Sequence, residues 1–268
     1  MTYHLAIAGV AGRMGRSLIS AALSSNDYKL IGGTERPGSG ELDKDLGALV
    51  GAETLGVKAS LSAMEAGQTA DVWVDFTSPV STLEALDALK TTQIRAAVIG
   101  TTGFNDAEED ALRKHGERIA VVKAGNFSLG VNLVAALVEQ AAARLGDDWD
   151  IEVLETHHRH KVDAPSGTAL MMGEAAAQGR GKDLKDLQTP PYDGVTGPRE
   201  AGKIGFSVRR SGGVIGDHET TFASENEIIS LRHTAMDRSI FAHGALKAGL
   251  WAVNQPPGYY NMRDVLGL

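Results

Sequence analysis

Short apolar runs alternate with segments of helical spacing along the first half of the chain. The expected strands are Leu5–Ala8, Lys29–Gly33, Asp71–Phe76, Ala96–Gly100 and Ile119–Lys123. The expected helices between them are Arg13–Ser24, Ser81–Leu89 and Asn105–His115. Short strands that alternate with helices are typical of βαβ units, which build a parallel sheet covered on both faces. The pattern therefore predicts a doubly wound α/β fold for residues 1–127.

The pattern changes in the second half of the chain. Val131–Leu145 has the composition of a long alanine-rich helix, and Ile151–Thr156 that of a strand. Three β-type segments then follow without helices between them: Lys203–Arg209, Val214–Ala223 and Glu227–His233. Strands in direct succession indicate a second α+β domain, residues 128–238, built on a mixed, open sheet. We expect residues 178–203 to be a long irregular loop and Ser239–Val253 to be a helix.

A glycine-rich turn follows the first expected strand. It comprises Gly9, Val10, Ala11, Gly12, Arg13, Met14 and Gly15, a GxxGxxG pattern that departs from the GxGxxG fingerprint by one residue. Glycines between a strand and a helix allow backbone to approach a pyrophosphate, which binds the N–H groups at the helix start. The position of the turn favours a Rossmann-type dinucleotide site, and the alternative is that these are ordinary loop glycines.

An acidic residue stands where the fingerprint expects one, at the end of the second strand. Glu35 would bond the ribose hydroxyls of NADH, and the adjacent Arg36 would meet the 2′-phosphate of NADPH. Having both residues predicts tolerance of either cofactor. Two later strand ends are further candidates for cofactor contacts, although each is equally well explained as a strand-to-helix turn. These candidates are Gly100, Thr101, Thr102, Ala124, Gly125, Asn126 and Phe127.

The densest group of chemically active residues is the basic run His157–Lys161, which is followed by Pro165, Ser166, Gly167 and Thr168 before an apolar helix. A basic run is unexpected in a protein of net charge −8. Hydroxyls and N–H groups at a helix start are suited to carboxylate or phosphate. We therefore favour a site for an anionic substrate, with a His or Lys as proton donor.

Two other interpretations of the basic run stay open. If the segment continues as a strand, His158 and His160 share one face and could ligate a metal, although Arg159 and Lys161 would repel it. The run could also be a solvated surface. We assign no metal site. His115, His218, His233 and His243 show no partner in the sequence and are interpreted as surface or interface histidines.

Composition narrows the function classes further. The chain contains no cysteine, which excludes a thiolate nucleophile, a disulfide framework and a thiolate-bound metal or cluster. Its acidic balance argues against nucleic-acid binding, and its short apolar runs argue against a signal peptide or a membrane span. We therefore expect a soluble cytoplasmic protein with no nucleic-acid or membrane partner.

Five segments of the sequence resemble the 4-hydroxy-tetrahydrodipicolinate reductase (dihydrodipicolinate reductase) family. They are VAGRMGR, VIGTTGF, AGNFSLGVN, ETHHRHKVDAPSGTA and the C-terminal YYNMRDVLGL, so the resemblance covers nearly the whole chain. The resemblance implies reduction of a cyclic dicarboxylate to tetrahydrodipicolinate with NADH or NADPH, in the diaminopimelate route to lysine. Hydride would reach ring C4.

The resemblance also implies roles for individual residues. His157 matches the catalytic histidine of the family and Lys161 its proton-donating lysine, while His158, Gly167 and Thr168 match contacts to the substrate carboxylates. Gly9 to Met14, Glu35, Arg36, Gly100 to Thr102 and Ala124 to Phe127 match cofactor-binding positions. It further implies a homotetramer assembled through the second domain, and a first domain completed by residues 239–268. A non-catalytic dinucleotide sensor and another dehydrogenase are the alternatives.

Overall fold

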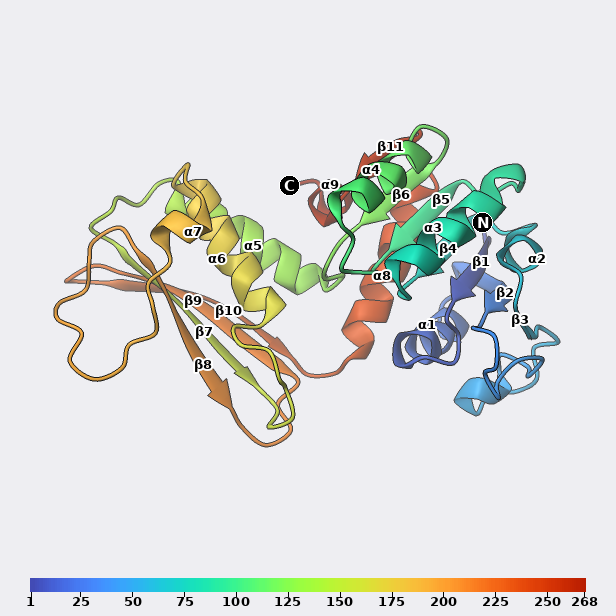
Figure 1. Ribbon diagram of the computed structural model, residues 1–268, viewed down its shortest axis with the longest axis horizontal. Coiled ribbons are helices and arrows are strands. Elements are labelled where there is room, and N and C mark those ends of the chain that lie inside the picture. The colour runs from blue at the N-terminus through green and yellow to red at the C-terminus, as the bar shows by residue number, and fades with distance from the viewer. The chain divides into compact units, whose positions relative to one another are not determined.

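The computed structural model describes all 268 residues, which divide into two compact units. Unit 1 comprises Met1–Ser128 and Ser239–Gly267, and unit 2 comprises Leu129–Arg238 together with the last residue, Leu268. Both ends of the chain therefore contribute to unit 1, as the blue and red ribbons in Figure 1 show.

The core of unit 1 is a seven-stranded parallel sheet. Its order is β11-β6-β5-β4-β1-β2-β3, so the direction of winding reverses between β1 and β4. The strands are β1 (Tyr3–Ala8), β2 (Tyr28–Thr34), β3 (Ala59–Ser60), β4 (Val72–Asp75), β5 (Ala96–Ile99), β6 (Ala120–Lys123) and β11 (Gly258–Tyr260). This sheet confirms the predicted doubly wound fold. Ligands of such sheets bind at the carboxyl ends of the strands near this reversal.

Helices cover the sheet, which is why every residue of β4 and β5 is buried. They are α1 (Arg13–Leu23), α2 (Ala63–Gly67), α3 (Pro79–Ala88), α4 (Asp106–His115), α8 (Ser239–Ala252) and α9 (Met262–Leu266), with short 3₁₀ turns η1 (Ala48–Val50) and η2 (Leu89–Thr91). A capping box between Asn105 and Glu108 fixes the start of α4, since each side chain accepts a backbone N–H of the other residue. Helix α8 packs on α1 and on β4, β5 and β6.

Unit 2 is a four-stranded mixed sheet with helices on one face (Figure 1). The strands β7 (Asp150–His157) and β8 (Ile204–Arg210) run parallel, whereas β9 (Gly216–Ala223) and β10 (Ile228–Ala235) pair antiparallel, in the order β10-β9-β7-β8. The helices are α5 (Leu129–Ala142), α6 (Gly167–Gly179) and α7 (Leu184–Leu187). Val138, Ile151 and Phe222 belong to the core between helices and sheet. The mixed, open sheet was predicted correctly.

The sequence pattern missed only short elements. Strands β3 and β11 contain two and three residues, and helices α2 and α9 contain five each, too few to show a period. The expected loop 178–203 is interrupted by the four-residue helix α7. No helix combines the length and the apolar character needed to cross a membrane.

Two histidines expected at the surface are buried instead. His115 is 7% exposed and His218 is 5% exposed. His218 lies on β9, on the face of the sheet that α5 and α6 cover, and its Nε2 is 3.0 Å from the hydroxyl of Ser166, the N-cap residue of α6. Burial, reinforced by the nearby His157, lowers the pKa of His218 from its ordinary 6.5 to about 4.

Because the native state resists protonation of His218, the unfolded state binds more protons between pH 6.5 and about pH 4. The contribution of this group to stability is therefore complete above pH 6.5 and is lost as the pH falls through that range, by at most about 3 kcal/mol. We expect His218→Gln to flatten the fall in the free energy of unfolding over this range, measured by urea unfolding at a series of pH values. The exposed His243→Gln is the matched control and should leave the slope unchanged. An unaltered slope in His218→Gln would contradict the prediction.

Candidate active site

Three glycines shape the turn between β1 and α1. Gly9 has a φ of +65°, which side chains disfavour, and Gly12 is the N-cap of α1 without any side-chain cap. A Cβ on Gly15 would lie 2.1 Å from the carbonyl oxygen of Gly9, so only glycine allows α1 to pack this closely on the turn. The first N–H groups of α1 therefore lie directly after β1, in an arrangement that suits a phosphate group.

The predicted acidic residue of the fingerprint lies against this turn. The Glu35 carboxylate, just after β2, accepts a hydrogen bond of 2.9 Å from the N–H of Ala11. The neighbouring Arg36 is exposed. The structure thus brings together two parts of the sequence that the fingerprint relates only by spacing.

The remaining cofactor candidates follow β5 and β6, at the same edge of the sheet. The hydroxyl of Thr101 is 2.9 Å from that of Thr82 and accepts a hydrogen bond of 3.0 Å from the N–H of Thr77. It also lies 3.3 Å from the carboxyl of Asp75, which is completely buried. Burial raises the pKa of Asp75, although its threonine partners act in the opposite direction. The Thr101 side chain therefore holds the loop together.

The side chain of Phe127 is likewise part of the interior. It is 1% exposed, and its ring centroid is 5.5 Å from that of Phe76. Gly100 makes room for this pair, because a Cβ there would lie 2.0 Å from the Phe76 ring. The Phe127 carbonyl is packed inside as well, because a Cβ on Gly244 of α8 would lie 1.7 Å from its oxygen.

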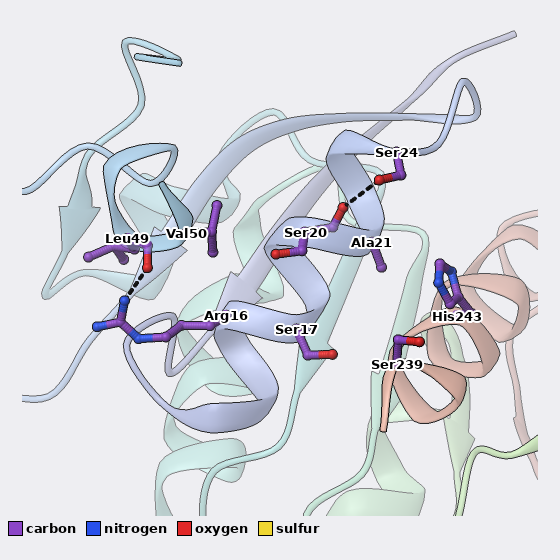
Figure 2. Close-up of a pocket in the computed structure, with 9 residues that line it drawn as sticks. All are labelled: Arg16, Ser17, Ser20, Ala21, Ser24, Leu49, Val50, Ser239 and His243. Atoms are coloured by element: carbon purple, nitrogen blue, oxygen red, sulfur yellow. Dashed lines mark hydrogen bonds between the residues drawn. The ribbon is translucent and has the colours of Figure 1, made fainter. Parts of the chain in front are cut away.

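Unit 1 also contains a pocket of about 480 Å³ outside the predicted site. Figure 2 shows its lining: Arg16, Ser17, Ser20, Ala21 and Ser24 of α1 and its end, Leu49 and Val50 of η1, and Ser239 and His243 of α8. The Arg16 guanidinium is already bonded to the carbonyl of Leu49, as the dashed line marks. None of these residues is among the predicted cofactor contacts.

In unit 2, strand β7 ends at His157, and the rest of the basic run is a loop that leads to α6. The condition for the metal interpretation, that the run continues as a strand through His160, is therefore wrong. The loop reaches Ser166, whose hydroxyl accepts the N–H of Ala169 and caps α6. The predicted Gly167 is exposed at the first position of this helix.

The loop is rich in positive charge. Burial lowers the pKa of His158, and the nearby basic groups Arg238, His157, His160 and Lys161 lower it further. The ammonium of Lys161 donates to both carboxylate oxygens of Asp163, each at 2.8 Å. This ion pair lowers the pKa of Asp163. A surplus of cations beside a helix start is the environment that stabilises a bound carboxylate.

A buried carboxylate lies behind the predicted catalytic histidine. Glu155, 1% exposed, bonds Nδ1 of His157. Glu155, His157 and His218 place ligand atoms within 4.8 Å of one another, as a metal site would. However, Nη1 of Arg210 lies 3.2 Å from both oxygens of Glu155, so that carboxylate already has a cation. The donor set therefore fits a hydrogen-bonded histidine better than a metal.

The structure brings the predicted residues together as two groups, the cofactor candidates in unit 1 and the substrate candidates in unit 2. Sequence reasoning assigned no role to Glu155, Arg210, His218 or Arg238, all of which contribute to the second group. One signal was available for Glu155. It lies on the expected strand Ile151–Thr156, two residues before His157, and both side chains point to the same face once the strand extends by one residue, as β7 does.

Comparison with known proteins covers both units. Residues 3–127 match the N-terminal domain of dihydrodipicolinate reductase and residues 130–266 match its C-terminal domain. The chain is 51% identical over 265 residues to the 4-hydroxy-tetrahydrodipicolinate reductases of Dinoroseobacter shibae and Parvibaculum lavamentivorans, which covers 98% of this chain and 98% and 97% of theirs.

A solved structure has the same fold. It is the dipicolinate-bound dihydrodipicolinate reductase of Paenisporosarcina sp. TG-14, which is 26% identical, with a TM-score of 0.75 and coverage of 97% of this chain and 98% of that one. An amine dehydrogenase of Mycobacterium smegmatis, 16% identical with a TM-score of 0.66, shares the fold alone. Matches to both domains and to relatives over nearly the full length show that this chain belongs to the dihydrodipicolinate reductase family.

Proposed function

We propose that this protein reduces 4-hydroxy-tetrahydrodipicolinate, by way of dihydrodipicolinate, to tetrahydrodipicolinate in the diaminopimelate route to lysine. The reaction removes water from the hydroxylated ring, adds hydride at ring C4 and adds one proton. The observation that carries the proposal is the cationic loop of unit 2, placed directly before the start of α6 in an acidic protein of this family. The Paenisporosarcina relative binds dipicolinate, a cyclic dicarboxylate of the same class.

We assign substrate binding to the loop and the helix start. His158 and the first turn of α6, with Gly167 and Thr168, would receive one carboxylate, since cations and helix N–H groups both favour a negative charge. Lys161 is paired with the exposed Asp163. A substrate carboxylate that replaces Asp163 would keep this ammonium charged and close to the ring.

We assign the proton transfer to Lys161 and His157. An ammonium has three donor hydrogens, and a histidine whose Nδ1 is held by a carboxylate presents Nε2 as its second exchangeable position. Both groups lie in unit 2, at the end of β7 and in the loop that follows. General acids of this kind contribute about 10²–10⁴-fold to a rate.

Unit 1 fits a nicotinamide dinucleotide, NADH or NADPH, which supplies the hydride when bound. Gly15 lets α1 begin tightly against the turn, because a Cβ there would lie 2.1 Å from the carbonyl oxygen of Gly9, and the first turn of α1 lacks a side-chain cap. Glu35, held against Ala11, would accept from ribose hydroxyls, and the exposed Arg36 would bind a 2′-phosphate. The segments 100–102 and 124–127 would contact the rest of the cofactor through backbone groups.

We infer that the chain forms a homotetramer through the face of the unit 2 sheet opposite its helices. Alternation along the strands places Leu154 and Ile228 on that face, and the Ile228 side chain is 68% exposed. An uncovered sheet face with apolar side chains is stabilised by packing against another copy. Light scattering should then give four times the chain mass of 28.2 kDa.

Lys161→Ala should abolish most turnover while preserving the binding of the reduced cofactor, because the loop of unit 2 and the glycine turn of unit 1 are separate groups. We expect kcat to fall by about 10²–10⁴-fold. The assay follows nicotinamide oxidation, with substrate generated from pyruvate and aspartate semialdehyde by the preceding synthase. The exposed Lys182→Ala is the control. Tight cofactor binding without turnover in the wild-type protein would instead favour a dinucleotide sensor or a different dehydrogenase.

Glu35 and Arg36 should separate the two cofactors. Arg36→Ala removes the partner of the 2′-phosphate and should raise KM for NADPH by about 10-fold or more, since a charge-assisted hydrogen bond contributes about 1.5–3 kcal/mol. The same substitution should leave KM for NADH nearly unchanged. Glu35→Gln should raise KM for NADH and spare NADPH. Equal effects on both cofactors in either variant would contradict these roles.

A further inference from the structure

Arg210 occupies a central position behind the basic loop. It is the last residue of β8, and the parallel pairing of β7 with β8 places it beside His157. Its side chain is 23% exposed, whereas that of Glu155 is 1% exposed. Sequence patterns gave it no role, because it lies 49 residues after Lys161.

The Arg210 guanidinium bonds strand and loop at the same time. Nη1 donates to both oxygens of Glu155 at 3.2 Å, on β7. Nη2 donates to the carbonyl of Asp163 at 2.6 Å, and Nε donates to the carbonyl of Lys161 at 3.4 Å. The planar fork of an arginine can satisfy acceptors in several directions, which one ammonium cannot do.

Glu155 links Arg210 to His157 and to the end of the loop through hydrogen bonds. One carboxylate oxygen bonds Nδ1 of His157, and the other accepts the N–H of Ser166 at 3.1 Å, where the loop ends. With Nδ1 held by the carboxylate, Nε2 is the nitrogen left for other contacts. Space for the ring comes from Gly216, where a Cβ would lie 3.2 Å from Nε2.

We propose that Arg210 is a positioning residue, which fixes Lys161 relative to His157 by bonding Glu155 and the backbone of the loop together. This inference rests on the proposed function, in which those two residues handle the proton. The simpler role is neutralisation of the buried Glu155 charge, which any cation in this place would perform. A lysine in place of Arg210 can neutralise Glu155 but cannot also bond the loop carbonyls, so this substitution separates the two roles.

The test is Arg210→Lys, with Arg144→Lys as the matched control on an exposed arginine of the same unit. The lysine keeps the charge beside Glu155 but cannot reach the two loop carbonyls as well. We expect kcat to fall by about 10–100-fold, the scale of a displacement near 1 Å, with the melting temperature and the KM for the cofactor little changed. Full activity in Arg210→Lys would overturn positioning and leave charge neutralisation. A wild-type protein without turnover would contradict the proposed function instead.

A second variant covers the case in which Arg210→Lys folds poorly. Arg210→Met combined with Glu155→Gln removes both charges, so no uncompensated buried charge remains. The glutamine oxygen can still accept from His157 Nδ1, but the amide NH2 cannot accept the N–H of Ser166, so Glu155→Gln alone is the reference for this double variant. Positioning by Arg210 predicts that this double variant stays slow although it is stable. Recovery of the wild-type kcat would show that Arg210 only neutralises Glu155.

Discussion

The buried carboxylate of Glu155 is the constraint on which unit 2 depends. An ionised group with 1% exposure is tolerable only if its oxygens are fully bonded. Its donors come from the end of β8, the end of β7 and the residue that caps α6. Satisfying one charge therefore brings a strand end, a loop and a helix start to the same place, and these are the parts that the proposed reaction uses.

The positive charge of this loop also differs in sign from the net charge of the chain. The chain as a whole is acidic, with a net charge of −8, yet the loop of unit 2 concentrates cations. The positive potential around this loop favours the binding of dianionic ligands there. The acidic remainder of the surface does not attract nucleic acid. Asp163, held by Lys161, occupies part of that positive region, so a ligand of the proposed kind would have to replace an internal partner that is already in place.

Sequence patterns were most successful where the information was local. The strand, glycine turn and helix of residues 5–24 could be predicted from adjacent residues alone, and spacing along the chain singled out Glu35 as a candidate. The hydrogen bond from the N–H of Ala11 to Glu35 could not be predicted from the sequence pattern, because it depends on how β1 pairs with β2. The same limit explains His218 and Arg210, whose partners on β7 are set by strand register rather than by distance along the chain. Thr101 was predicted as a site residue, but the burial of its hydroxyl depends on contacts with Asp75 and Thr77 that spacing cannot show.

The discontinuous chain path of unit 1 has a consequence for its synthesis. Residues 1–128 leave the ribosome first, yet β11 and α8, which pair with β6 and cover the sheet, leave it last. Unit 2 is continuous apart from Leu268, and all of its strands and helices are complete before α8 exists. Of the two units, the one whose synthesis begins first is thus the last to be finished. Until then the side of β6 that faces away from β5 has no strand to pair with. Such an unpaired edge is a site where nascent chains associate with one another.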